Sequence, residues 1–129
     1  MIILDTDTCV ELLRGNGRVI EQRALTDDVI AVSFMSVAEL YYGVERSSRP
    51  AQARHAVGAL LLSVLVVESY RAIAQRFGQL KTELWRDSVL VPDADLFIAA
   101  TTLVHGSLLV TGNTRHFERI GGLRLQRWT

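Results

Sequence analysis

The sequence predicts an α/β fold, in which a small, mostly parallel β-sheet is flanked by helices on both faces. Short apolar runs alternate along the chain with segments whose apolar residues recur every three or four positions. Strands that alternate with helices form parallel sheets covered on both faces. The chain has 129 residues, 49% of them hydrophobic, and no linker or repeat divides it. We therefore expect residues 1–129 to form a single domain.

The N-terminal half is expected to contain two buried strands and several helices. Residues 1–4 and 29–33 are apolar runs of strand length, and the first of them ends at Asp5. Gly15 is a natural stop for the helix that follows the first strand. Helices are predicted over residues 8–14, 17–25, 36–45 and from about 51 to 62.

The C-terminal half contains the clearest helix. Over residues 69–85, apolar side chains three or four positions apart share one face. Pro92 precedes a further helix, from residue 93 to about 105, which Gly106 ends. Short strands are expected at residues 64–67, 108–110 and 123–125.

Composition and cysteine content indicate a cytoplasmic protein without membrane contact. Cys9 is the only cysteine, so an intramolecular disulfide is impossible, and its apolar setting favours a small core residue. The longest apolar run, residues 56–67, is too short to span a bilayer. The formal net charge is +0, so bulk electrostatics do not indicate nucleic-acid binding, although a local basic patch could still bind phosphate.

Three acids stand at the ends of predicted elements among apolar neighbours. Asp5 ends the first strand, Glu39 follows closely after Ser36, and Asp95 follows closely after Pro92. If the strands are parallel, all three converge at one edge of the sheet. Carboxylates held close together repel one another unless a cation neutralises them. Mg²⁺ or Mn²⁺, which prefer oxygen ligands, would suit such a cluster.

Each acid also has a structural explanation. Ser36 and Glu39 match a capping box, in which Glu39 would bond the backbone N–H of Ser36. Asp93 has the character of an N-cap, and Asp95 would favour the positive end of the helix dipole. Asp5 or the neighbouring Asp7 could cap the first helix. From the pattern alone, both interpretations stay open.

Four segments resemble the motifs of the PIN-domain ribonucleases, and most closely those of the VapC-type toxins of toxin–antitoxin pairs. They occur in the family's order across essentially the whole chain, at residues 2–8, 35–43, 92–100 and 109–117. The resemblance implies a PIN-like fold that cleaves RNA phosphodiester bonds with a water activated by Mg²⁺ or Mn²⁺. It also implies inhibition by a cognate VapB-type antitoxin protein, and a homodimer.

The resemblance assigns roles to particular residues. Asp5, Glu39 and Asp95 match the three acids that hold the metal ion. Asp93, at the same helix start as Asp95, is expected as a further metal-binding acid.

The fourth motif departs from the common family pattern. Many relatives have another acid where this chain has His116. A neutral histidine cannot replace that negative charge, but it could bind a metal, polarise a water or contact a phosphate. Asn113 could orient catalytic groups through hydrogen bonds, or it could be a turn residue after a strand. We therefore expect Asn113 and His116 to belong to the catalytic site.

Two other functions remain as alternatives. A PIN-like module with His116 in place of an acid could bind RNA or a partner without cutting. Asp5 and Asp7 after an apolar strand also resemble the start of a haloacid-dehalogenase phosphatase. That family has Thr or Val where this chain has Cys9, and it has a later paired acidic motif preceded by glycine, which is absent here.

Overall fold

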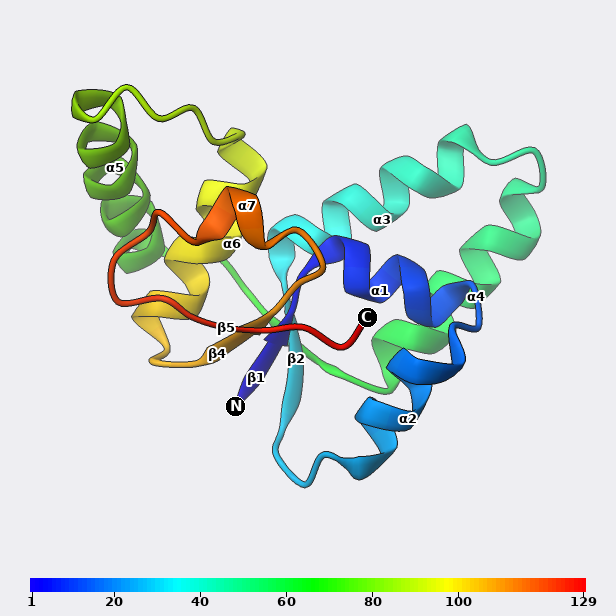
Figure 1. Cartoon of the computed structure of the whole chain (residues 1–129). Helices are drawn as coiled ribbons and strands as arrows, with labels where there is room; N and C mark the ends of the chain where they lie inside the picture. Colours follow the sequence, from blue (N-terminus) through cyan, green and yellow to red (C-terminus); the bar gives the residue numbers. More distant parts are fainter.

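The computed structural model describes all residues, 1–129, and has one parallel sheet with helices around it (Figure 1). The strands are β1 (Ile2–Leu4), β2 (Ile30–Ser33), β3 (Leu65–Val67), β4 (Leu108–Val110) and β5 (Arg124–Gln126). The helices are α1 (Thr6–Leu13), α2 (Gly17–Leu25), α3 (Phe34–Arg46), α4 (Pro50–Leu62), α5 (Arg71–Arg86), α6 (Asp93–Val104) and α7 (Thr114–Phe117). The predicted α/β class is confirmed.

Strand β1 lies at the centre of the sheet, whose order is β3-β2-β1-β4-β5. All neighbouring strands are parallel, and Ile3 of β1 lies opposite Ala31 on one side and Leu109 on the other. Parallel strands place their carboxyl ends at the same edge of a sheet. The residues that follow β1, β2 and β4 are therefore neighbours at one edge.

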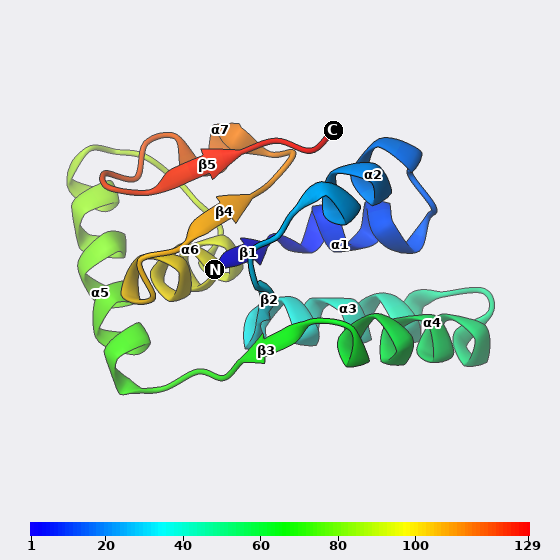
Figure 2. The same ribbon diagram turned by 90° about the horizontal axis from the view of Figure 1, so that it is seen from below.

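Helices cover both faces of this sheet (Figure 2). The side chains of β1 alternate between two hydrophobic cores because successive strand residues point to opposite faces. Ile3 packs with Ile73 and Leu80 of α5 in one core. Ile2 and Leu4 pack in the other core, which α1, α2, α3 and α4 also line. Packing in the two cores holds the sheet in place between its helices. It therefore also holds in place the residues that follow the strands at their carboxyl ends.

The N-cap suggested for one helix is confirmed, and those suggested for two others are wrong. Asp5 is the N-cap of α1, one of the two caps that the sequence suggested: its carboxylate accepts the backbone N–H of Thr6, and the helix begins there, two residues earlier than predicted. Ser33 caps α3 by accepting the backbone N–H of Ser36 at 3.1 Å, so a capping box beginning at Ser36 is wrong. Asp93 is the first residue within α6 rather than its N-cap.

Cys9 is fully buried in the second core, as expected of a small core residue. Burial, reinforced by the nearby Asp5 charge, raises the pKa of its thiol to about 12. The thiol therefore stays protonated at neutral pH. None of the helices combines the length and apolar character needed to cross a membrane.

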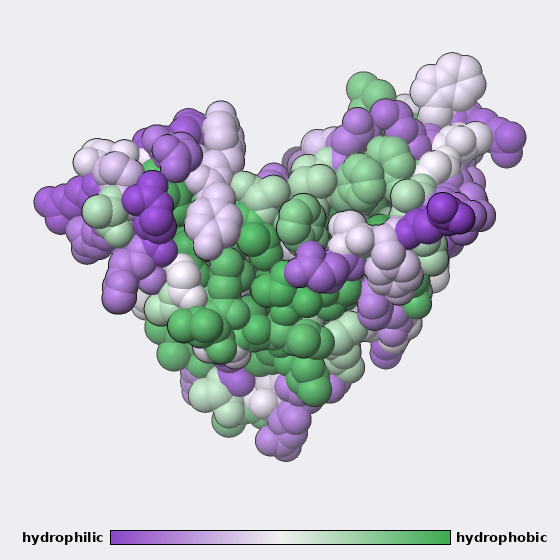
Figure 3. Space-filling model, turned by 180° about the vertical axis from the view of Figure 1, so that it is seen from behind, coloured by the Kyte–Doolittle hydropathy of each residue, from purple (hydrophilic) through white to green (hydrophobic).

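The side of the molecule away from the viewer in Figure 1 carries a broad apolar surface between two projecting arms (Figure 3). β3 is the edge strand of the sheet on this side. Leu65 of β3 is 52% exposed and Leu62, just before it, is 92% exposed. Such exposure of large apolar side chains at a sheet edge is typical of a surface that another protein covers.

Candidate active site

The three predicted acids line one cavity at the carboxyl ends of the central strands. Its volume is about 430 Å³, and Asp5, Glu39, Asp95, Asn113 and His116 all lie in its wall. Asp5 follows β1 directly, Glu39 is carried by the helix that begins where β2 ends, and Asn113 follows β4 closely. The parallel sheet therefore brings together residues that are up to 111 positions apart in the chain.

Asp5 is buried, and both of its carboxylate oxygens have hydrogen-bond donors. Oδ1 accepts the backbone N–H of Thr6 at 2.8 Å, and Oδ2 accepts the hydroxyl of Thr111 at 2.7 Å. Burial, followed by repulsion from the charge of Asp7, nevertheless raises the pKa of Asp5 to about 7. A cation beside Asp5 would favour its ionised form and offset this penalty.

Glu39 is held against the start of α1. Its Oε1 accepts the hydroxyl of Thr6 at 2.7 Å, and Thr6 Oγ1 also lies 2.9 Å from Ser36 Oγ. Thr6 thus contacts two acids of the site, because its backbone N–H bonds Asp5 while its hydroxyl bonds Glu39. This threonine fixes the relative positions of the two carboxylates.

Asp95 belongs to a second chain of hydrogen bonds, on α6 and α7. His116 Nδ1 lies 2.5 Å from Asp95 Oδ2, and Asn113 Nδ2 lies 2.9 Å from the same histidine nitrogen. A proton on Nδ1 would bond the Asp95 carboxylate, and that nitrogen would then not accept a hydrogen bond from Asn113 Nδ2, which only packs against it. His116 therefore contacts one of the three acids directly, as a ligand-orienting histidine would.

Asp93 lies apart from this arrangement. Its Oδ1 accepts a hydrogen bond from Lys81 Nζ at 2.9 Å, and both side chains are more than half exposed. Asp93 does not line the cavity that Asp95 lines. Its predicted metal-binding role therefore has no geometric support here and stays a prediction.

One face of α1 contributes cavity residues that the sequence analysis did not assign to the site. Asp7, Glu11 and Arg14 line the cavity, three or four positions apart as residues on one helix face must be. That spacing was visible in the sequence and could have identified them once Asp5 was placed at the start of the helix. Arg14 is the only arginine or lysine in the lining.

The side chains around the cavity suit a hard divalent cation. Five carboxylates line it, from Asp5, Asp7, Glu11, Glu39 and Asp95. No three His, Cys, Asp or Glu side chains are grouped closely enough to bind one ion together. The donor set is nevertheless almost purely oxygen, and burial with mutual repulsion already raises the pKa of Asp5. Carboxylates of this kind fit Mg²⁺ or Mn²⁺, which commonly keep several water ligands.

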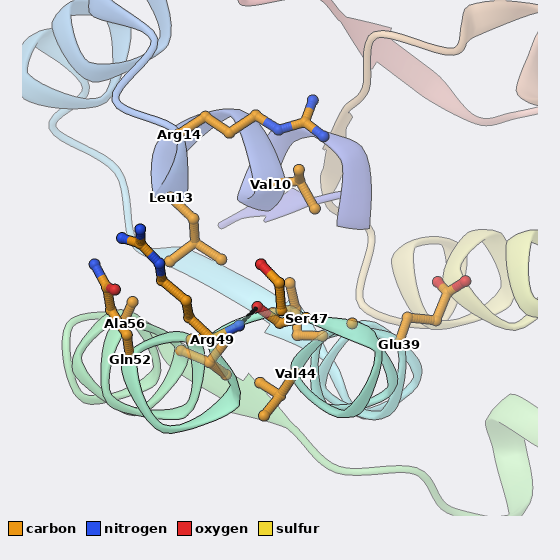
Figure 4. A pocket seen from close by; sticks show the side chains of 14 residues that line it. Val10, Leu13, Arg14, Glu39, Val44, Ser47, Arg49, Gln52 and Ala56 are labelled. Carbon is orange, nitrogen blue, oxygen red and sulfur yellow. Dashed lines mark hydrogen bonds between the residues drawn. The ribbon is translucent and has the colours of Figure 1, made fainter.

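A second, larger cavity of about 630 Å³ adjoins the first, between α1 and the pair α3–α4 (Figure 4). Val10, Arg14 and Glu39 line both cavities. Leu13 of α1 and Val44 of α3 both line the groove, and Glu39 lies at one end of it. The groove, which has both apolar and polar side chains in its lining, therefore adjoins the acidic site.

Comparison with known proteins gives consistent results. The chain matches the PIN domain family over residues 2–123. It is 31% identical over 128 residues to the tRNA(fMet)-specific endonuclease VapC of Shigella flexneri, covering 98% of this chain and 97% of the relative. It is 35% identical over 99 residues to ribonuclease VapC2 of Haemophilus influenzae, covering 77% of this chain and 75% of that protein.

Solved structures show the same fold. VapBC2 from Rickettsia felis, bound to a DNA fragment from its promoter, superposes with a TM-score of 0.94 at 28% identity and covers 100% of both chains. DNA-bound VapBC from Salmonella typhimurium superposes with a TM-score of 0.94 at 30% identity, covering 99% of this chain and 98% of that one. With an acid-lined cavity at the expected strand ends, these full-length likenesses show that the chain belongs to the PIN-domain family, among its VapC ribonuclease toxins.

Proposed function

We propose that this VapC-family ribonuclease hydrolyses RNA phosphodiester bonds in the acid-lined cavity, where Asp5, Glu39 and Asp95 bind Mg²⁺ or Mn²⁺. The observation that carries the proposal is the convergence of these three acids, from three separate parts of the chain, on one cavity. When bound, such a cation activates a water for attack and stabilises charge on the phosphoryl oxygens. Residues 1–129 would form the single domain that does this.

The roles of the other residues follow from their contacts. Thr6 and Thr111 hold Asp5, Thr6 holds Glu39, and His116 with Asn113 orients Asp95. No side chain is proposed as a nucleophile, since a water takes that part. Arg14, exposed at the mouth of the cavity, is placed to bind a phosphate of the RNA.

The names of two relatives suggest which RNA to test first. Proteins of Shigella flexneri and Salmonella typhimurium, at 31% and 32% identity, are called tRNA(fMet)-specific endonucleases. We propose a structured RNA, with initiator transfer RNA as the first candidate. Such an RNA would be recognised by its shape and its unstacked bases.

A VapB-type antitoxin is the proposed inhibitor. The similar structures from Rickettsia felis and Salmonella typhimurium are VapBC assemblies. In this chain, the groove between α1 and α3–α4 has walls of mixed apolar and polar side chains and adjoins the active site (Figure 4). An amphipathic antitoxin helix would fit there and cover Glu39 and Arg14. Toxin, antitoxin and RNA would meet in the cytoplasm.

A homodimer is proposed through the apolar surface of Figure 3. β3 leaves one side of its backbone unpaired at the sheet edge, next to the exposed Leu62 and Leu65. A second copy of the chain would cover these side chains. Sedimentation of the antitoxin-free protein would test this assembly, and a monomer at micromolar concentration would contradict it.

Cleavage of total RNA and of initiator transfer RNA by antitoxin-free protein tests the proposed activity. The reactions contain Mn²⁺, Mg²⁺ or EDTA, and the Asp5→Asn variant is run beside the wild type. Discrete fragments that need metal and disappear in the variant are expected. Tight RNA binding without product, with Mn²⁺ present, would instead support the non-cutting module. Family membership sets aside the haloacid-dehalogenase alternative.

A further inference from the structure

Asp7 has no role in the chemistry proposed above, although it lies beside Asp5 in the cavity wall. Its Oδ2 accepts the backbone N–H of Gly112 at 3.1 Å. Gly112 lies 105 positions later, in the loop between β4 and α7. The hydroxyl of Thr8 makes a similar connection when it donates to the carbonyl of Val110 at 3.2 Å. The first turn of α1 is therefore tied to the end of β4 and to the loop after it.

The contact leaves little room for a side chain at position 112. A Cβ atom on Gly112 would lie 3.0 Å from Asp7 Oδ2 and 3.4 Å from Thr129 Oγ1. The first of these distances is tighter than nine in ten real Cβ contacts, so the Asp7 carboxylate would have to move by a few tenths of an ångström. Glycine is therefore favoured here by the close approach of the Asp7 carboxylate to the backbone.

The loop that Asp7 holds connects the two sets of acid contacts. On one side of Gly112, the Thr111 hydroxyl donates to Asp5 at 2.7 Å. On the other side, the Asn113 backbone N–H donates to Thr111 Oγ1 at 3.0 Å. The Asn113 side chain then meets His116, which contacts Asp95. Movement of Gly112 would disturb this whole series of contacts.

We propose that Asp7 is a positioning residue, which anchors the loop 111–113 through Gly112 and thereby aligns Asn113, His116 and Asp95 for RNA cleavage. The inference rests on the proposed function, since the loop matters only if those residues serve catalysis. The anchor needs an acceptor oxygen at position 7 and does not need a charge. An asparagine would supply that oxygen, whereas an alanine would not.

Cleavage kinetics of four variants and one control variant test whether Asp7 anchors the loop. In Asp7→Ala, kcat should fall about 10- to 100-fold with KM for RNA unchanged, because small displacements of catalytic groups are costly. Asp7→Asn should restore most of the loss. Gly112→Ala should also lower kcat, and the double variant Asp7→Ala/Gly112→Ala should lose less than the product of the two single losses, because the crowded carboxylate is gone. Asp27→Asn, at an exposed position, is the matched control for removing a charge.

A second measurement needs neither metal nor RNA. Hydrogen exchange of the Gly112 amide, followed by NMR in EDTA, should be at least about 10-fold faster in Asp7→Ala than in the wild type or Asp7→Asn. Melting temperatures of the variants identify any loss that comes from unfolding. Unchanged Gly112 exchange in a folded Asp7→Ala protein would overturn the proposal.

The two proposals fail in different ways. If Asp5→Asn abolishes cleavage and Asp7→Ala keeps the wild-type kcat, the anchor is refuted and the ribonuclease site stands. If Asp7→Asn is as impaired as Asp7→Ala, the charge matters rather than the hydrogen bond, and the anchor is again refuted. If the wild type cuts no RNA, the proposed function fails, and the exchange of the Gly112 amide still decides whether Asp7 holds the loop.

Discussion

The two walls of the cavity hold their acids in different ways. On the wall formed by the ends of β1 and β4, Asp5 is buried and both of its oxygens accept hydrogen bonds, from Thr6 and Thr111. On the wall formed by α6 and α7, Asp95 is half-buried and its carboxylate is bonded by one side chain, His116, from the short helix α7. The sheet thus fixes Asp5, whereas the position of Asp95 depends on a single partner.

The largest expected effect is on the Asp5 wall. Asp5→Asn keeps the size of the side chain but removes its charge from the proposed cation site. We expect metal-dependent RNA cleavage to fall on the order of 1,000-fold, measured as kcat/KM on the same RNA. The exposed Asp27→Asn is the control and should stay at the wild-type value. Wild-type cleavage by Asp5→Asn would remove Asp5 from the mechanism.

Burial of Asp5 also predicts a pH dependence of stability in metal-free protein. The pKa of Asp5 is about 7 when folded and 3.8 for an ordinary aspartate, so between these pH values the unfolded chain releases a proton that the folded chain keeps. Stability is therefore lost as pH rises from about 4 to about 7. Asp5→Asn should exceed the wild type in unfolding free energy by a few kcal/mol at pH 8.

Urea unfolding of both proteins in EDTA, at several pH values, measures this difference. The gap between Asp5→Asn and the wild type should grow through the window and then stay level above it. A gap that is the same at pH 4 and pH 8 would show that Asp5 ionises as easily in the folded protein as in water.

The Asp95 wall predicts a smaller loss, because His116 acts through another residue. His116→Ala removes the only side chain that bonds Asp95, and we expect activity or metal affinity to fall about 10- to 100-fold. Steady-state cleavage at several Mn²⁺ concentrations separates the two. His55→Ala, at an exposed histidine of α4, is the control. If His116→Ala behaves like His55→Ala, Asp95 does not depend on this contact.

The smallest effect on RNA cleavage is expected when Asp93 is replaced. Its carboxylate is directed to Lys81 on the surface, in an ion pair whose net contribution is small. Asp93→Asn should therefore change kcat/KM for RNA by less than about twofold. A loss as large as that of Asp95→Asn would reinstate Asp93 as a metal-binding acid and would require its side chain to leave Lys81.

The Asp5 wall is the part of the site that sequence reasoning predicts best. Asp5 follows a short apolar strand in a chain whose strands alternate with helices. Such a chain forms a parallel sheet, and the acid is therefore predicted at the carboxyl edge of that sheet. Glu39 is positioned in the same way by the helix that follows β2. The capping box suggested at Ser36 was wrong, because nothing in the local sequence shows that Ser33, a chemically similar residue, caps the helix instead. Only the pairing of Ser33 with Val67 places Ser33 at the end of the strand.

The other wall depends on tertiary contacts that no local pattern contains. The four-residue helix α7 is too short to show a periodicity, so it was not predicted. The ion pair between Lys81 and Asp93 joins α5 to α6, and it forms only when those helices pack together. The contact between Asp7 and Gly112 is of the same kind, since it depends on the close approach of α1 to the end of β4.

Calorimetric titration of Mn²⁺ into antitoxin-free protein tests the central claim, that acids on both walls form one cation site. We expect a bound ion in the wild type and in Asp93→Asn, and affinity at least about 10-fold weaker in both Asp5→Asn and Asp95→Asn. Wild-type affinity in either of the last two variants would contradict the account, because the acids of the two walls would then not serve the same ion.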